Sequence, residues 1–324
     1  METLTAKVEG TLTCTKCGVS CKRFGKHRNG LQRFRCRLCG ATFTEDHEVS
    51  FRIEDYLGQA RGIMAIQLLV EGCSIRTVER ITGLHRDAIM RLLLAAGERC
   101  ERLMDTLIQN VPARDVQSDE IWSFVGKKEK NTTLEDNPTL GDSYCWVAIE
   151  ARTKLVLSFV VGKRSVTDAI EFTRKLRRAT SASRRFQLTT DGLPHYVTAV
   201  DLTLSDRCDF AQLIKIYASP REGDQRYSPG EVVEAVPVVI SGNPNPNRIC
   251  TSHVERQNLT MRMQIRRLTR LTNAFSKKFE NHKAAIALHF AYYNFCQIHR
   301  TLRVTPAMEA RITDRVWTIA ELMA

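Results

Sequence analysis

The chain has 324 residues, a length that at ~150 residues per domain predicts about two domains. Its 43% hydrophobic and 26% charged residues are typical of a globular protein and exclude a disordered or fibrous chain. A formal net charge of +12 favours a polyanionic partner. The longest apolar runs are far shorter than the ~18 residues of a membrane helix. The N-terminus lacks the basic start and apolar core of a signal peptide. We therefore expect a cytoplasmic, nucleoid-associated protein with no membrane partner.

The basic residues are concentrated in two segments. Between Cys14 and Cys39 there are eight basic residues and no acid. Between Arg256 and Arg303 there are ten basic residues and one acid, Glu280. A solvated charged surface usually mixes both signs, so this distribution favours nucleic-acid binding over that alternative.

The first 50 residues carry a C-x2-C-x18-C-x2-C pattern, formed by Cys14, Cys17, Cys36 and Cys39. Two such pairs match tetrahedral zinc, and a glycine follows each pair, where the turn needs a positive φ. A redox or purely structural cysteine cluster is the alternative. Cys21 and His27 are possible substitute ligands, but the symmetric pairs favour the other four. We predict a zinc ribbon over residues 1–50, with Arg35 and Arg37 as candidate DNA contacts.

Residues 51–110 show helical periodicity. A helix begins near Tyr56, Ser74 is a good N-cap for a second helix over 75–81, and Gly83 precedes a third over 86–97. This pattern predicts a DNA-binding helix-turn-helix, in which His85, Arg86 and Arg91 are candidate contacts. A small helical bundle that does not bind DNA has the same spacing and is the alternative.

After Pro112 the pattern becomes strand-like. We expect strands at 116–125, 144–150 and 155–161, then a helix capped by Thr167 or Asp168, and a fourth strand at 186–190. This order describes the front half of an RNase H-like fold. The predicted fold class is therefore α+β and multidomain: a zinc ribbon, a helix-turn-helix, and an RNase H-like α/β mixed-sheet core with C-terminal helices over residues 111–324.

Two aspartates occupy the positions at which that fold places acids. Asp119 lies inside the first strand, where aspartate is unfavourable, and Asp191 ends the fourth. Taken singly, Asp119 is equally well an edge-strand surface acid and Asp191 a turn residue before Gly192. At matching ends of adjacent strands, the pair predicts a metal site.

A third carboxylate is expected from a helix that runs from about Ser252 to Leu271. Glu255 lies at its start, beside a buried stripe of Val254, Met261, Ile265 and Leu268. The structural alternative is a capping box in which Ser252 is the N-cap and Glu255 is at N3. The preceding segment, 203–248, has five prolines and a possible strand at 213–217. We interpret it as an insertion, either a DNA-contacting flap or a plain surface loop. Its Glu231 and Glu234 are rivals to Glu255.

At this point the whole chain resembles a DDE transposase of the insertion-sequence-one family. The resemblance is carried by the four-cysteine ribbon and by the segments Asp119-Glu-Ile-Trp-Ser-Phe-Val-Gly126, Thr190-Asp191-Gly192 and Thr251-Ser-His-Val-Glu255-Arg-Gln-Asn258. The tail Ala291-Tyr-Tyr-Asn-Phe295, with His299-Arg300 and Thr305-Pro306, is similar to transposase and integrase C-terminal helices. Asp191 and Glu255 have 63 residues between them, more than in the compact members of the family.

The resemblance implies that Asp119, Asp191 and Glu255 form a catalytic triad that holds Mg²⁺ or Mn²⁺. It also implies double-stranded DNA partners (the terminal inverted repeats of an element and its target) and a homodimer or larger synaptic assembly. Two divalent ions can activate the attacking oxygen and stabilise the leaving oxygen of a phosphodiester. Candidate phosphate or DNA contacts are Lys154, Lys163, His253, Arg256, Arg262 and Arg266.

Two competing classes share part of this pattern. A zinc-ribbon and helix-turn-helix regulator, or a catalytically decayed transposase copy, would bind DNA without needing the three acids together. A stand-alone RNase H-like nuclease would need the acids but hardly two DNA-recognition modules. The transposase hypothesis uses every segment.

Overall fold

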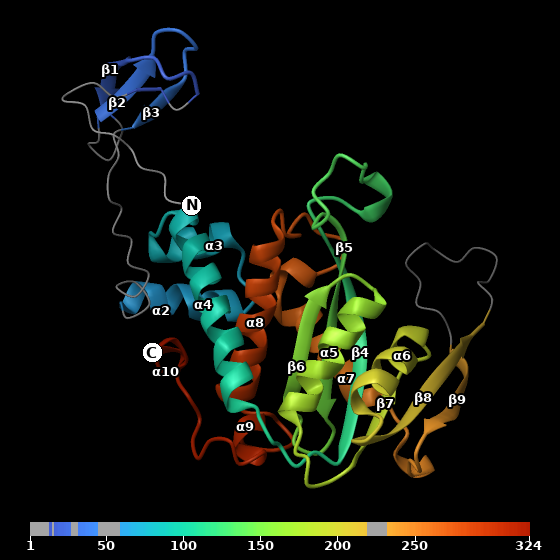
Figure 1. The fold of residues 1–324 in the computed structure, drawn as a ribbon. Coiled ribbons are helices and arrows are strands. Elements are labelled where there is room, and N and C mark those ends of the chain that lie inside the picture. Colours follow the sequence, from blue (N-terminus) through green and yellow to red (C-terminus); the bar gives the residue numbers. More distant parts are fainter. Residues whose placement is uncertain (1–12, 15, 27–31, 45–58, 219–231) are drawn as a thin grey trace. The chain divides into compact units, whose positions relative to one another are not determined.

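A computed structural model describes residues 13–14, 16–26, 32–44, 59–218 and 232–324 (Figure 1). The chain divides into two compact units, residues 1–52 and 53–324, each with a hydrophobic core of its own. His27, Tyr56 and Glu231, which enter the sequence predictions, lie outside the described residues. None of the helices in the described ranges combines the length and apolar character that crossing a membrane requires.

The first unit is a small antiparallel sheet of β1 (Cys21–Lys26), β2 (Gln32–Cys36) and β3 (Thr42–Thr44). Its buried core consists of three cysteines and one phenylalanine: Cys14, Cys21, Cys36 and Phe34. Both glycines after the cysteine pairs have the predicted positive φ, +70° and +71°. So small a core cannot stabilise a fold by apolar burial alone, which favours a bound metal in this unit.

The second unit begins with three helices, α2 (Ala60–Val70), α3 (Ile75–Thr82) and α4 (Arg86–Leu107). The predicted cap is present, because Ser74 Oγ accepts a hydrogen bond from Thr77 N at 3.1 Å. Gly83 ends α3 in the left-handed conformation, with φ of 70°.

The third of these helices is longer than predicted. The sequence analysis ended it at Gly97, but α4 continues to Leu107. Gly97 is instead the point where α4 meets α8 (Phe279–Phe295): a Cβ there would lie 2.4 Å from the Ala284 Cα. The glycine therefore permits a close approach of two helices, and only the tertiary contact shows this.

A mixed six-stranded sheet forms the centre of the second unit, in the order β6-β5-β4-β7-β8-β9. In this sheet β5 is antiparallel to both β4 and β6. β7 is parallel to both β4 and β8, and β9 is antiparallel to β8. The strands are β4 (Asp115–Val125), β5 (Gly141–Glu150), β6 (Val156–Gly162), β7 (Phe186–Thr190), β8 (Cys208–Tyr217) and β9 (Val232–Ser241). The four predicted strands are thus confirmed.

The prediction that residues 203–248 are an insertion is wrong for most of this segment. Its start completes α6 (Pro194–Leu204), and β8 is a strand of the sheet itself, parallel to β7. β9 adds the edge strand, where Pro237 is tolerated because an edge needs no donor on its outer side. Two segments of the described chain between Asp191 and Glu255, β8 and β9, therefore belong to the sheet, and the rival Glu234 is exposed on β9.

Helices cover both faces of the sheet: α5 (Val166–Ala179) and α6 one face, α7 (Ser252–Gln264) and α8 the other (Figure 1). On the first face Trp146, Phe172 and Tyr196 pack with ring centroids 5.2–6.3 Å apart. On the second, Phe159 and Phe290 lie 5.0 Å apart.

Two predicted helix starts need correction. The N-cap of α5 is Ser165, whose Oγ accepts from Asp168 N at 3.1 Å, not Thr167 or Asp168. Ser252 is the first residue of α7 and not its cap, so the predicted capping box is absent. Thr251 stands at the cap position and its hydroxyl donates to the Glu255 carboxylate instead. The four predicted stripe residues are all buried, but α7 ends at Gln264 and not near Leu271, so only Val254 and Met261 lie on it.

The C-terminal segment closes the second unit. Asn294 on α8 pairs with the backbone of the edge strand β6, accepting from Val156 N at 3.0 Å and donating to Val156 O at 2.9 Å. The remaining short helices are η1 (Glu129–Asn131), η2 (Pro246–Arg248), η3 (Arg266–Leu268), α9 (Pro306–Glu309) and α10 (Ile319–Met323).

Candidate active site

The predicted acids meet where two parallel strands part. β4 and β7 are paired from Asp115 only as far as Gln117, opposite Thr189. Two residues further along β4 lies Asp119, and Asp191 directly follows β7. Beyond the pair of Gln117 and Thr189, β4 and β7 diverge, which leaves room for side chains between them. The sheet topology thus brings together two acids that are 72 positions apart in the sequence.

Asp119 and Asp191 are held by short-range hydrogen bonds. Asp119 accepts from Glu120 N and from Asn258 Nδ2 of α7, both at 2.8 Å. Burial, together with the charge of Asp191, raises the pKa of Asp119 to about 6. Asp191 Oδ1 accepts from Leu193 N at 3.1 Å, and burial raises the pKa of this carboxyl as well.

Glu255, on the first turn of α7, faces the same hollow. Its carboxylate accepts hydrogen bonds from Lys215 Nζ of β8 and from the Thr251 hydroxyl. Asp119, Asp191 and Glu255 all line one cavity of about 430 Å³. The three acids predicted from the sequence therefore line one cavity, but Glu255 is not part of the closest acidic group, which Asp119 and Asp191 form with Glu120.

Sequence analysis missed a fourth acid, Glu120. Its carboxylate lies close to those of Asp119 and Asp191, and one oxygen from each of the three is within 4.8 Å of the other two. Its side chain is 2% exposed, and burial and the charge of Asp191 raise its pKa to about 7. Both of its oxygens are occupied, because Arg164 Nε donates at 2.8 Å and Tyr196 Oη at 3.2 Å.

Sequence analysis also missed the cations at this site, Arg164 and Lys215. Arg164 lies 3.9 Å from Asp191 Oδ2, and both cations line the acidic cavity. Two of the cations proposed from the sequence, Lys163 and Lys154, lie elsewhere. Lys163 Nζ donates to Glu129 at 3.1 Å, and Lys154 Nζ lies 3.1 Å from His253 Nδ1, outside this cavity.

The residues present fit a divalent metal ion. Two carboxyls with raised pKa values, Asp119 and Asp191, face each other at a half-buried position with a third acid on the same cavity wall. Like charges at this spacing repel, and a bound cation would relieve that repulsion. Carboxylate oxygens are the ligands that Mg²⁺ and Mn²⁺ prefer.

The four predicted zinc ligands also lie together. The sulfur atoms of Cys14, Cys17, Cys36 and Cys39 are within 4.8 Å of one another. Cys36 Sγ accepts from Cys39 N at 3.5 Å and from Leu38 N at 3.4 Å, and these N–H groups lower the pKa of the Cys36 thiol to about 6. That favours the thiolate, the form that binds zinc. Cys21 is buried beside this cluster but is not among the four.

Most of the predicted DNA-contact residues are exposed. They are Arg35 and Arg37 in the first unit, and Arg86, Arg91, Arg256 and Arg266 in the second. Arg35 lies over the Phe24 ring at 5.3 Å, so an aromatic ring and a cation share one face of the small sheet. Arg262 differs, since it is half-buried and donates to the carbonyls of Trp122 and Leu268.

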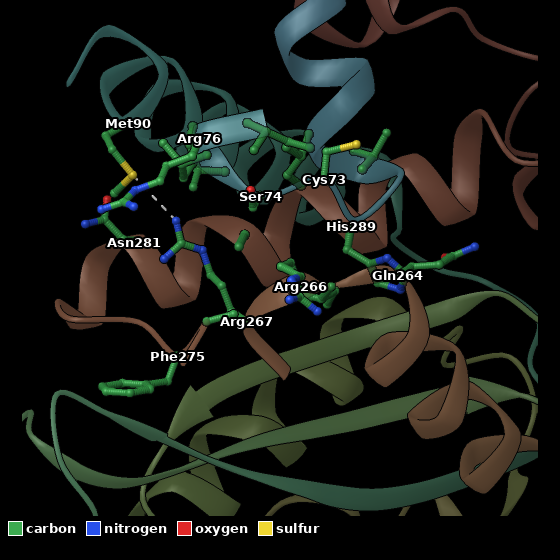
Figure 2. A pocket seen from close by; sticks show the side chains of 18 of the residues that line it. Cys73, Ser74, Arg76, Met90, Gln264, Arg266, Arg267, Phe275, Asn281 and His289 are labelled. Carbon is green, nitrogen blue, oxygen red and sulfur yellow. Dashed lines mark hydrogen bonds between the residues drawn. The ribbon is translucent and has the colours of Figure 1, made fainter. Parts of the chain in front are cut away.

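Arg266 borders a second hollow of about 330 Å³, between the α2–α3 connection and α8 (Figure 2). Arg267 reaches across it and donates to Met90 Sδ, the interaction drawn as a dashed line (Figure 2). Gly72 touches this region, because a Cβ there would lie 2.9 Å from Gln264 O. The helical segment 60–107 is thereby packed onto the C-terminal segment of the same unit.

In comparisons with known proteins, part of the chain matches one family model, and several solved structures show a distant similarity to the chain. Residues 244–296, which contain Glu255 and all of α8, match the family model of the IS1 transposases. No curated protein matches the chain significantly. The resemblance to insertion-sequence-one transposases is thus confirmed over this segment.

Solved structures with some likeness to the chain include a piggyBac transposase synaptic complex with hairpin DNA and a Mos1 strand transfer complex. The first is 12% identical with a TM-score of 0.37, over 84% of this chain and 69% of the other. The second is 16% identical with a TM-score of 0.22, over 46% of this chain. This chain spans 56% of the Mos1 chain.

Proposed function

We propose that this protein is a DDE-type DNA transposase: it binds the inverted-repeat ends of an insertion sequence and performs metal-dependent strand cleavage and strand transfer. The observation that carries the proposal is the meeting of Asp119, Asp191 and Glu255 on one cavity wall. The match of residues 244–296 to the IS1 transposases supports it, since that segment supplies one of the three acids.

In this proposal the second unit contains an RNase H-like catalytic core. Its first strand carries Asp119, its fourth strand ends at Asp191, and the helix beside them carries Glu255. These acids would hold Mg²⁺ or Mn²⁺, which supplies activation of an attacking oxygen and stabilisation of a leaving oxygen when bound. Asn258 orients the Asp119 carboxylate through its 2.8 Å hydrogen bond.

Glu120 has a different role from the other three acids. It is almost fully enclosed and already satisfied by Arg164 and Tyr196. We assign it to positioning Arg164 near Asp191, where the guanidinium can neutralise a phosphate. Lys215, which pairs with Glu255, supplies a second positive charge to the same end of the cavity.

DNA recognition is assigned to the other segments. The four cysteines hold structural zinc in a ribbon over residues 1–50, and α2, α3 and α4 form a helix-turn-helix within residues 51–110. The remaining residues, 111–324, form the catalytic domain. Arginines 35, 37, 86, 91, 256, 262 and 266 are the proposed DNA contacts. Two element ends must be held together for transposition, so we expect a homodimer or a larger assembly on DNA.

Replacement of Asp119 tests this function. Asp119→Asn keeps the shape of the side chain and one acceptor oxygen but removes the charge. We expect loss of Mg²⁺-dependent cleavage of DNA carrying the element end, with binding to that end retained in a mobility-shift assay. Cleavage at the wild-type rate would remove Asp119 from the site. Binding by the wild-type protein without any cleavage would instead indicate a DNA-binding regulator or a decayed copy.

A further inference from the structure

The acidic cavity continues into a groove that the catalytic proposal does not use. Asp119 and Glu255 also line a neighbouring hollow of about 410 Å³, which extends over Trp122, Arg262 and Arg270. Those last three residues in turn line a further hollow of about 540 Å³. The shared residues make the hollows continuous from the acids to the end of β4.

The walls of this groove combine aromatic rings with cations. Trp122 and Phe124 alternate along β4, so they project from the same side of the strand, with ring centroids 5.9 Å apart. Phe275 follows, 4.6 Å from Phe124. We call this the aromatic groove; its residues are Trp122, Phe124, Phe275, Lys128, Arg262 and Arg270. All three rings are only partly buried.

In the described part of the chain, cations of the aromatic groove share its acidic end with Asp119, Glu120 and Glu255 but form no ion pair with these carboxylates. Among the described residues, no carboxylate forms an ion pair with Arg262, Arg267 or Arg270, and the chain has no acid between Glu255 and Glu280. Lys128 Nζ lies 6.0 Å from the Phe124 ring centroid. Arg267, which is half-buried, lies at the far end, with its guanidinium 3.1 Å from Ser276 Oγ. Arg262 is also half-buried, and Arg270 is exposed. Half-buried cations without acidic partners favour an anionic occupant.

We propose that the aromatic groove binds single-stranded DNA, namely the unpaired nucleotides that adjoin the phosphodiester at the acids. This inference rests on the proposed function, because the acids define where the strand begins. A duplex covers the faces of its own bases, so only an unpaired strand can stack on Trp122 and Phe124. Alternating aromatic and basic side chains are the general means of binding single strands without sequence preference.

Separation of the two DNA strands at this site would assist the proposed cleavage reaction. The continuous path from the acids to Trp122 guides one strand away from its complement, so the scissile phosphate becomes accessible to Asp119 and Glu255. The groove thus assigns a substrate form, locally unpaired DNA, to the catalytic site.

The test is a comparison of single- and double-stranded binding by the full-length protein in EDTA, with fluorescein-labelled oligothymidylate of about 15 nucleotides and a duplex of equal length. Trp122→Ala should weaken single-strand binding roughly ten-fold, because the stacking of an unpaired base on the indole ring is lost. It should leave duplex binding within about two-fold, because paired bases do not stack on this ring. Trp122→Phe should retain most of the affinity, since it keeps an aromatic face. Trp317→Ala is the matched control: Trp317 packs on Phe295 at 5.1 Å, outside the groove.

Tryptophan fluorescence gives an independent readout. The chain has three tryptophans, and Trp146 is fully buried. Oligothymidylate should quench wild-type emission, and Trp122→Phe should abolish that quenching while it preserves binding. Equal losses on single strands and duplex, or an unchanged affinity of Trp122→Ala for the single strand, would overturn the inference. Neither readout requires cleavage, so failure of the proposed enzyme activity would be seen separately, in the Asp119→Asn experiment.

Discussion

The cysteine site and the acidic site each gather negative side chains for a metal ion, but they are assembled in opposite ways. The four cysteines fall within residues 14–39, and tight turns present each pair. The three acids come from β4, the end of β7 and α7, and only the sheet topology brings them together. Local spacing therefore encodes the first site, whereas the second depends on the whole fold.

The two sites also differ in what supports them. The cysteine site has almost no core besides its own sulfurs and Phe34. The acidic site is backed by the large core of the second unit, including Trp146, Phe172 and Tyr196. We therefore expect that the first unit needs its metal ion in order to fold. The second unit should fold without a metal ion and need it only for catalysis.

Removal of zinc should give the largest effect. Structural zinc contributes about 10 kcal/mol or more in small domains, so Cys36→Ser should unfold the first unit and release the metal. The second unit should keep its melting temperature. Thermal unfolding followed by tryptophan fluorescence reports on that unit alone, since all three tryptophans lie beyond residue 52. Cys21→Ser is the control, and equal zinc loss from both variants would contradict the four-cysteine assignment.

Substitution of the two glutamates at the acidic site should have the next largest effect. Glu255→Gln should lower the rate of Mg²⁺-dependent cleavage about a thousand-fold, because it removes a charged ligand. Glu120→Gln should lower it only about ten-fold, since Arg164 loses a charged partner but the metal ligands remain. The measurement is single-turnover cleavage over a range of Mg²⁺ concentrations. A larger effect at Glu120 than at Glu255 would make Glu120 the third ligand.

A smaller effect concerns the response of the second unit to acid. His282 is fully buried between Ser123 Oγ at 2.9 Å and Ser276 Oγ at 3.2 Å, and burial lowers its pKa to about 4. Between about pH 6.5 and 4 the unfolded chain binds a proton here that the folded chain does not. The free energy of unfolding should therefore fall as the pH falls, by about 1.4 kcal/mol per pH unit from this residue.

The pH effect is measured by urea denaturation followed by tryptophan fluorescence at several pH values. In His282→Gln the free energy of unfolding should change less steeply with pH, by about 1.4 kcal/mol per pH unit between pH 4 and 6.5. His85→Gln, at an exposed helix cap, is the control and should leave the slope unchanged. Identical slopes for His282→Gln and the wild-type protein would show that His282 is not the residue responsible.

Local patterns predicted much of the fold. Four strands, the Ser74 cap and the Gly83 turn are in their expected places, and the predicted stripe residues beside Glu255 are buried. In each case the signal lies within a few residues: strand alternation, a capping hydroxyl or a helical repeat. The three acids were identifiable because Asp119 is an unusual residue inside a strand, Asp191 follows the end of another strand and Glu255 lies in the first turn of a helix.

Long-range contacts account for what the sequence did not predict. Gly97 suggested a helix end, but its role is set by Ala284 on a distant helix. The prolines of this segment suggested an irregular insertion, but Pro237 lies in β9, an edge strand that tolerates it. Arg164 and Lys215 reach the acids from other segments of the chain, and no local pattern marks them as neighbours. Glu120 directly follows Asp119 on β4, but only the contacts with Arg164 and Tyr196 show that its side chain is enclosed.

The most direct test of the account is cleavage of a labelled DNA duplex that carries the flanking inverted repeat. Wild-type protein and Asp191→Ala are compared, each with Mg²⁺ and with EDTA. The account predicts nicking at the repeat end by the wild-type protein with Mg²⁺ only, and none by the variant. Nicking in EDTA, or undiminished nicking by Asp191→Ala, would contradict a catalytic metal site at the junction of β4 and β7.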